Sequence, residues 1–153
     1  MSFSVFLNSV NGSGSTSSSV YQFNWDNIKQ DQDGYMGKYK LYFSFWSVGT
    51  GLTTSASSVP IVRINLGTTQ NSYSASTSNG TANNRILGYL HPDQIGANHN
   101  ILANYYDNCP VVINGLPSNN QITVEILNAS GTAFTDIDAV EYLMTLYFER
   151  YDE

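Results

Sequence analysis

The sequence predicts an all-β sandwich, and three observations lead to this fold class. Short runs of β-branched and aromatic residues, separated by clusters of Gly, Pro, Asn and Ser, recur along the chain. In several runs apolar and polar residues alternate with a period of two, which suits one buried face of a strand and not a helix. Helical patterns are nearly absent. We therefore expect two packed sheets joined by connections of uneven length.

Eight segments show the strand pattern. They are residues 2–7, 20–25, 38–48, 59–66, 85–90, 110–113, 121–127 and 140–151. Eight strands with unequal connections favour an eight-stranded jelly-roll (Greek-key) sandwich over an up-and-down barrel. Because the chain has no internal repeat and no shift in composition, residues 1–153 are expected to form a single domain.

The segments between these strands are mostly expected to be loops. The Ser-rich run at residues 11–19 is flexible by composition. Residues 26–37 form an acidic loop that contains Gly. Residues 67–84 contain almost no apolar side chains, so they form either a surface excursion or a weak hairpin. One short helix is allowed, at residues 92–95.

One strand is apolar on both faces, and another carries aromatic residues on its polar face. In residues 38–48 the inward positions are Tyr39, Leu41, Phe43 and Phe45, whereas Lys38, Lys40 and Ser44 share the other face with Tyr42 and Trp46, which are expected to be partly exposed or at an interface. Residues 140–151 are apolar on both faces. A strand of this kind is covered on both sides or meets a partner chain. The predicted interface residues are Tyr42, Trp46, Leu143, Thr145 and Tyr147.

Composition excludes two classes of partner. Charged residues make up 12% of the chain, about half the usual share. The formal net charge is -6, with only 6 Lys and Arg residues and no basic run. Because binding to phosphates or to anionic lipids needs clustered cations, we expect neither nucleic acid nor a membrane as a partner. The opening residues lack the basic and long apolar regions of a signal peptide.

The metal-binding signals are weak. His91 and His99 match no ligand spacing known for zinc. Asp31, Asp33 and the following Gly resemble part of a calcium loop, but Met36 stands where an EF-hand loop needs its Gly. A polar turn explains these aspartates better. We expect no metal and no cofactor.

No set of residues predicts catalysis. Cys109 has no partnering base in the sequence, so we expect a buried structural cysteine, and a single cysteine allows no internal disulfide. The carboxylates Glu125, Glu141 and Glu149 are best explained as surface or interface residues, because glycoside hydrolysis needs two converging carboxyl groups. An enzyme is therefore the least favoured class of function, and we name no catalytic residue.

Two loop regions are candidates for ligand binding. Aromatic and acidic side chains concentrate in residues 26–37 and 91–107, and their candidate ligand residues are Asp31, Asp33, Tyr35, Tyr105 and Tyr106. Tyr21 and Trp25 would complete an aromatic platform for a sugar ring. Packing in the core or at an interface is the commoner role for such aromatic residues, and we favour it for the set.

Three segments together resemble a known group of proteins. They are GKYKLYFSFWSV at residues 37–48, CPVVINGLPSNNQITVEIL at 109–127 and EYLMTLYFERY at 141–151. This pattern, which spans most of the chain, resembles the single jelly-roll proteins that build the capsids of large eukaryotic DNA viruses and their virophages. The resemblance implies a minor capsid or penton subunit without a cofactor. It also implies a homo-oligomer, pentamer or trimer, that contacts other capsid proteins in the virion after assembly in the host cytoplasm or nucleus.

A second class of function remains open. A carbohydrate- or receptor-binding β-sandwich, such as a fibre head, a lectin or a trimer similar to C1q and tumour necrosis factor, would use the aromatic loops to hold a glycan. An obligate ring or trimer favours the shell protein. A soluble monomer with an open aromatic groove favours the lectin.

Overall fold

The structure is a computed structural model that describes residues 2–32, 35, 37–48, 53–54, 59–68, 74–76, 80–83, 86–93, 96–97 and 100–151. The first sheet contains β1 (Ser2–Asn8), β15 (Tyr142–Tyr151), β4 (Lys38–Val48), β12 (Asn100–Ala103) and β10 (His91–Pro92) in that order, and β13 (Val111–Asn114) also pairs with β4. The second contains β2 (Ser13–Ser15), β3 (Ser18–Gln22), β14 (Gln121–Leu127), β6 (Ile61–Asn65) and β9 (Ile86–Tyr89).

The remaining elements are short. β5 (Thr53–Thr54) pairs with β11 (Gly96–Ala97), and β7 (Ser74–Ser76) pairs with β8 (Gly80–Asn83). The helices are α1 (Trp25–Asp31) and the two 3-10 turns η1 (Ser9–Asn11) and η2 (Thr135–Ala139). Within the described residues no helix is long and apolar enough to cross a membrane.

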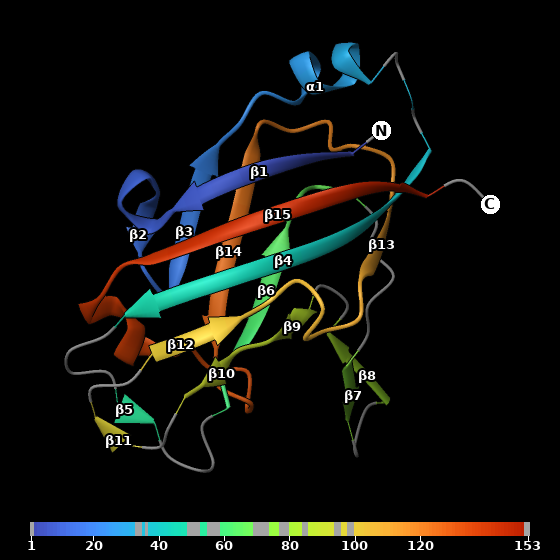
Figure 1. Ribbon diagram of the computed structural model, residues 1–153. Helices are drawn as coiled ribbons and strands as arrows, with labels where there is room; N and C mark the ends of the chain where they lie inside the picture. The colour runs from blue at the N-terminus through green and yellow to red at the C-terminus, as the bar shows by residue number, and fades with distance from the viewer. Residues whose placement is uncertain are drawn as a thin grey trace.

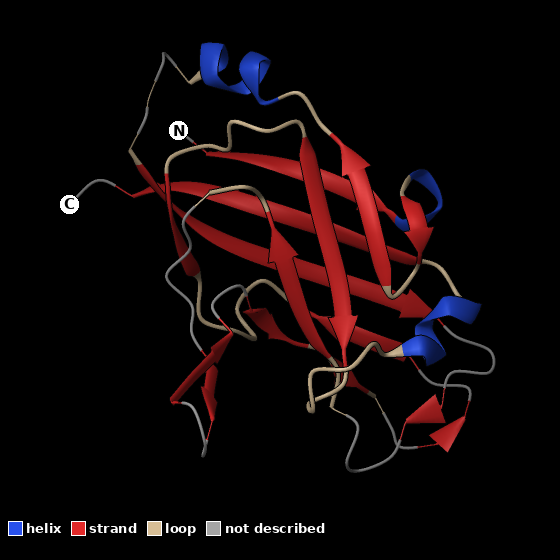
Figure 2. Cartoon of the chain, turned by 180° about the vertical axis from the view of Figure 1, so that it is seen from behind, coloured by secondary structure: helices blue, strands red, loops and turns tan. Residues whose placement is uncertain are grey.

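The connectivity is that of a jelly roll. The two sheets lie face to face, with β1, β15, β4 and β12 in front in Figure 1 and β3, β14 and β6 in front in Figure 2. Counting β1, β3, β4, β6, β9, β12, β14 and β15 as strands one to eight, the sheets have the orders 1-8-3-6 and 2-7-4-5. This is the double Greek key of a jelly roll. The predicted fold class is therefore confirmed.

The sixth strand position is divided between two segments. β12 pairs with β4 at Phe45 to Val48, whereas β13 pairs with the other end, at Lys38 to Leu41. The sequence pattern predicted only the second of these segments, at residues 110–113. β12 was missed because its four residues, including Asn100, are too short to show a clear alternation.

The core lies between the two sheets and confirms the predicted inward face of β4. Tyr39, Leu41, Phe43 and Phe45 are all nearly inaccessible to water. On the neighbouring β15 the ring of Phe148 packs edge-on against Tyr39, with ring centroids 6.3 Å apart. Burying each of these large side chains stabilises the fold by about 1.5–3 kcal/mol. The outward face of the same strands therefore takes no part in this core.

Residues 26–37 were expected to be a loop, but the structure begins that region with α1. Asn24 caps the helix by accepting a hydrogen bond from the Asp26 backbone N–H at 2.9 Å. Trp25 is buried and packs edge-on against Phe23 and Phe148, at 4.6 and 5.7 Å between ring centroids. The burial of Trp25 therefore fixes this short helix, and it also ends β3 at Gln22, earlier than predicted.

The Ser-rich run at residues 11–19 is likewise structured, contrary to the prediction. It forms η1, β2 and the turn into β3. At this turn the Ser17 backbone N–H and hydroxyl donate to the two carboxylate oxygens of Asp138, at 2.6 and 3.1 Å. Ser19 donates to the Ser15 carbonyl at 2.8 Å, and Gly14 supplies a positive φ of 94°. A carboxylate distant in sequence therefore orders a segment that is flexible by composition alone.

Two further expectations concern the middle of the chain. The alternative of a weak hairpin within residues 67–84 is confirmed by the short pair β7 and β8. The helix predicted at residues 92–95 is wrong at its start, because Pro92 lies in β10 and pairs with Ile101. Residues 94 and 95 lie outside the described residues.

Candidate interaction surface

The five predicted interface residues lie together on the outward face of the first sheet. Leu143 of β15 lies directly opposite Trp46 of β4, and Tyr147 lies opposite Tyr42 in the same ladder. Thr145 lies between these two pairs. Trp46 is 52% exposed and Leu143 is 48% exposed, whereas the other three are partly buried. The alternation of β15 therefore places one apolar set in the core and a second set on the surface.

The neighbouring strands widen this surface. Phe6 of β1 lies opposite Thr145 and is 79% exposed, and Leu102 of β12 lies opposite Trp46. A depression of about 330 Å³ opens beside Trp46, Leu102 and Leu143. We call Phe6, Trp46, Leu102 and Leu143 the apolar strip. It crosses four adjacent strands, β1, β15, β4 and β12.

Four tyrosines gather on the same sheet. Tyr106, which is 87% exposed, meets Tyr42 edge-on, with ring centroids 5.9 Å apart. Tyr147 lies 6.0 Å from Tyr42 and also 6.0 Å from Tyr105. These spacings are those of favourable aromatic pairs. This tyrosine cluster joins two residues predicted for an interface to two predicted for a ligand loop, which sequence patterns could not place side by side.

Charged groups border the tyrosine cluster at one end. Glu149 lies opposite Lys40 across the β15–β4 ladder. Reduced contact with water raises the pKa of Tyr42, and the neighbouring Glu149 carboxylate, which accepts a hydrogen bond from its hydroxyl, raises this pKa further. The Tyr42 hydroxyl therefore keeps its proton to a higher pH than an ordinary tyrosine, and the cluster borders one acid and one amine.

The other candidate ligand residues are not part of this cluster. Tyr35 is half-buried: its ring packs 5.5 Å from that of Tyr39 and is covered by the Arg150 guanidinium at 3.7 Å. Asp31 is exposed at the end of α1. Asp33 lies outside the described residues. The structure thus assigns Tyr35 to packing and separates it from Tyr105 and Tyr106.

The exposure of Cys109, Tyr21 and Trp25 bears on the roles expected for these residues. Cys109 was expected to be buried, and this is wrong: it is exposed in the segment between β12 and β13. The reason is that this segment leaves the sheet and runs over the surface before β13 begins. Tyr21 and Trp25 are buried, at 5% and 1% exposure. They are therefore core residues, as favoured, and cannot form a platform for a sugar.

Near the two candidate histidines, the acidic side chains of Asp93 and Asp107 accept backbone hydrogen bonds within turns. His91 is exposed in β10, and His99 lies outside the described residues. Asp93 accepts the Asn100 backbone N–H at 3.0 Å, and Asp107 accepts that of Asn104 at 2.7 Å. In the part of the chain that the structure describes, no three His, Cys, Asp or Glu side chains are grouped so that they could hold a metal ion.

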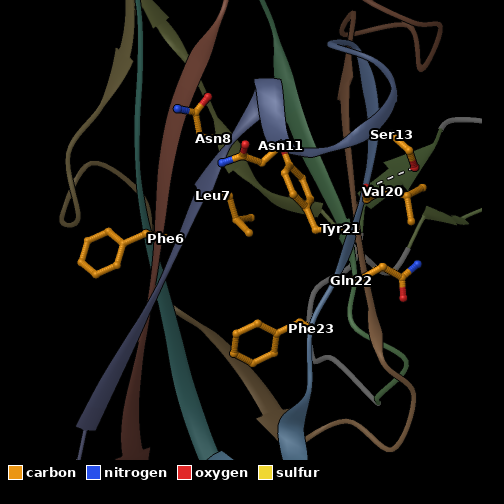
Figure 3. A pocket seen from close by; sticks show the side chains of 9 residues that line it. All are labelled: Phe6, Leu7, Asn8, Asn11, Ser13, Val20, Tyr21, Gln22 and Phe23. Carbon is orange, nitrogen blue, oxygen red and sulfur yellow. Dashed lines mark hydrogen bonds between the residues drawn. The ribbon is translucent and has the colours of Figure 1, made fainter.

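A second depression, of about 300 Å³, lies between β1 and the β2–β3 hairpin (Figure 3). Its lining residues are Phe6, Leu7, Asn8, Asn11, Ser13, Val20, Tyr21, Gln22 and Phe23. None of these nine carries a formal charge. The Tyr21 hydroxyl is already bonded to that of Tyr142 at 2.6 Å, and burial raises its pKa. The depression therefore suits an uncharged occupant and offers no acid or base for catalysis.

The chain is similar to a solved structure over nearly its whole length. No family model matches the chain, and no curated protein matches it. The tripod (BppUct-A-L) from the baseplate of bacteriophage Tuc2009 is similar at 15% sequence identity and a TM-score of 0.37. The match covers 97% of this chain and 64% of that one, so this chain spans less than two-thirds of its length.

Proposed function

We propose that this chain is a structural protein of a virus particle that works through protein–protein interfaces and not by catalysis. One observation carries the proposal: the apolar strip and the tyrosine cluster together cover the outward face of a sheet. Phe6, Trp46 and Leu143 are exposed on adjacent strands. Soluble monomers rarely expose large contiguous apolar patches, which usually mark sites of interaction.

The composition of the face suits a protein partner. Trp and Tyr are enriched in the centres of interfaces, where they contribute most of the binding energy. Trp46 lies in the middle of the apolar strip, between Leu143 on β15 and Leu102 on β12. A partner that covers this residue would remove apolar surface from water at about 25 cal/mol per Å². We therefore expect Trp46 to be the main anchor of the contact.

Fold and charge direct the proposal towards a virus particle. The jelly roll recurs in viral capsid domains, and also in lectins and cupins, so topology alone does not choose among them. Only 12% of the residues of the chain are charged, and a chain with so few charges lets many copies pack without strong repulsion. The net charge of -6 argues against contact with the genome. We propose a minor capsid or penton subunit of the virion, acting as a trimer or pentamer beside other capsid proteins and assembled in the host cytoplasm or nucleus.

The tyrosine cluster favours glycan or receptor binding as a second candidate function. Tyr106 presents almost its whole side chain to water, and the hydroxyl of Tyr42 lies beside the carboxylate of Glu149. Exposed rings next to hydrogen-bonding groups are suited to stack against a sugar and to bind its hydroxyls. This function is compatible with a role on the surface of a particle.

Light scattering coupled to size exclusion tests the proposal. We expect the wild type to have the mass of a trimer or pentamer and Leu143→Asp to have that of a smaller species. The matched control is Tyr89→Asp, because Tyr89 is 56% exposed on β9 of the other sheet. Equal effects of the two substitutions would contradict the proposed face. A wild type that stays monomeric at high concentration, yet binds a glycan array in a way that Tyr106→Ala removes, would replace the proposal with the second candidate.

A further inference from the structure

An edge strand exposes unpaired backbone N–H and C=O groups that can pair with a strand of another chain, and proteins usually block this pairing. Among the described residues the two main sheets have four outer edges, and three of them carry a block. β10 has two residues, one of which is Pro92. β2 has three residues and contains Gly14 in a left-handed conformation. On β9 the Asn108 side chain accepts from the Tyr89 backbone N–H at 2.9 Å and donates to the Tyr89 carbonyl at 3.0 Å. These edges are closed to strand addition.

The free edge of β13 is also closed to another strand. β13, which pairs with β4, is only four residues long and follows Pro110. The carbonyl of its last residue, Asn114, accepts a hydrogen bond from the Thr68 hydroxyl at 3.1 Å.

β1 differs from all of these strands. Its seven residues pair with β15 in an unbroken register, from Ser2 opposite Glu149 to Asn8 opposite Leu143. The segment SFSVFLN contains no charge, no proline and no glycine. In the described part of the chain β1 pairs with β15 alone. It therefore has a long, regular free edge, without the short length, proline, left-handed glycine or capping side chain that protects the other edges.

The space beside β1 is also open. The depression in Figure 3 runs along the second half of the strand, at Phe6, Leu7 and Asn8, so the β2–β3 hairpin does not close over these backbone groups. The side chains of Phe6 and Leu7 leave the strand on opposite sides, and that of Phe6 is the exposed one (Figure 3). It is the most exposed side chain of the apolar strip. A strand added at this edge would cover Phe6 without displacing any part of the core.

We propose that β1 pairs with β1 of a second copy of this chain, antiparallel and about a two-fold axis close to Phe6. In such a pair Phe6 lies opposite Phe6 and Val5 lies opposite Leu7, so outward residues face outward residues and inward residues face inward ones. Two molecules of net charge -6 repel each other, but the uncharged β1 keeps like charges away from this seam. The two first sheets become one continuous sheet, and their apolar strips join across it. This pairing uses an edge and not the face, so it would join subunits of neighbouring trimers or pentamers; it goes beyond the proposed function and does not depend on it.

Disulfide trapping at Phe6 tests the proposed pairing directly. In a Cys109→Ser background, Phe6→Cys is compared with Tyr89→Cys, an exposed aromatic on the protected edge strand β9. Directly opposed residues of antiparallel strands lie within reach of a disulfide. We expect dilute Phe6→Cys to form covalent dimers at least about tenfold faster than Tyr89→Cys, because pairing raises the local thiol concentration. Equal rates would overturn the inference.

Two further variants separate the edge from the face. Ser4→Lys places a cation on the exposed side of β1 in both copies, and its control is Ser13→Lys on β2. Ser4→Lys should weaken dimer formation by about tenfold, the factor that corresponds to the loss of roughly 1.4 kcal/mol, and Ser13→Lys should leave it unchanged. Trapping through Phe6→Cys should persist when Leu143→Asp removes the contact of the face. Loss of trapping in Leu143→Asp would mean that the face alone brings the thiols together, and would overturn the pairing through β1.

Discussion

Tyr21 and Tyr142 join the two sheets inside the core through hydroxyl oxygens 2.6 Å apart. Tyr21 comes from β3 of the second sheet and Tyr142 from β15 of the first, and both are almost fully buried. A buried hydroxyl is stable only while it is hydrogen-bonded, so each of the two satisfies the other. The pair therefore links the two sheets by a polar contact between otherwise apolar layers.

A double-mutant cycle should expose this dependence. Tyr142→Phe removes the Tyr142 partner of the Tyr21 hydroxyl, which also has a hydrogen bond with the Ser19 side chain, and should lower the free energy of unfolding by about 1–2 kcal/mol. The double variant Tyr21→Phe, Tyr142→Phe removes both hydroxyls and should be closer to the wild type than the sum of the single effects. Urea denaturation followed by tryptophan fluorescence measures all three. Additive losses would show that the two hydroxyls act independently.

The same pair predicts a loss of stability in alkali. Burial is the main cause that raises the pKa of both Tyr21 and Tyr142 above the ordinary value. In the unfolded chain these tyrosines lose their protons at about pH 10, whereas in the folded chain they stay protonated to higher pH. Stability is therefore fully present below about pH 10 and falls as the pH rises further. Unfolding measured from pH 8 upwards should show this decline, and the double phenylalanine variant should show a shallower one.

Much of the fold could be predicted because its long strands are half-buried and regular. β4 and β14 have the predicted bounds, since alternation over seven or more residues fixes both the element and its inward face. The same reasoning located the outward positions of Leu143 and Tyr147. What it could not supply was which side chains from other segments, such as Tyr106, come to lie beside them.

The missed features depend on contacts that are distant in sequence. Ser17 is ordered by Asp138, which lies 121 residues further on, so the local Ser-rich composition predicted flexibility. α1 was missed because it is short, although Asn24 as a cap and the spacing of Trp25 and Ile28 are local signals for it. The exposure of Cys109 follows from the path of the chain between β12 and β13, which no residue type determines.

Removal of the Asp138 carboxylate should loosen the β2–β3 hairpin. Asp138→Ala deprives the Ser17 backbone N–H and hydroxyl of their acceptors and should cost about 1–3 kcal/mol, since charge-assisted hydrogen bonds are stronger than neutral ones. Hydrogen exchange should become faster in residues 13–20 and stay slow in β4. Glu141→Ala, which removes an exposed carboxylate nearby, is the control. Unchanged exchange in the hairpin would show that β2 is held by its strand pairing alone.

Replacement of Trp46, the proposed anchor of the contact, should weaken assembly while the subunit stays folded. Trp46→Ser removes a side chain that is only half buried, so it should lower the free energy of unfolding of the subunit by about 1 kcal/mol, which leaves the subunit folded, while it weakens assembly. Val59→Ser, at a residue that is 44% exposed outside the sheet, should alter neither. Light scattering across a dilution series measures assembly, and denaturation at the lowest concentration measures folding. Normal assembly of Trp46→Ser would remove Trp46 from the proposed interface.

The Asn108 side chain should prevent another strand from pairing with the free edge of β9. Asn108→Ala frees the backbone N–H and carbonyl of Tyr89, which β6 does not engage. Because these groups lie at the surface, water can replace the lost bonds and stability should change little, but the edge becomes open to another strand. In the Cys109→Ser background, the rate of disulfide dimer formation through Tyr89→Cys should therefore rise in Asn108→Ala towards that of Phe6→Cys. Asn104→Ala, in the same segment, is the control, and an equal rise in both variants would indicate general loosening of residues 104–110.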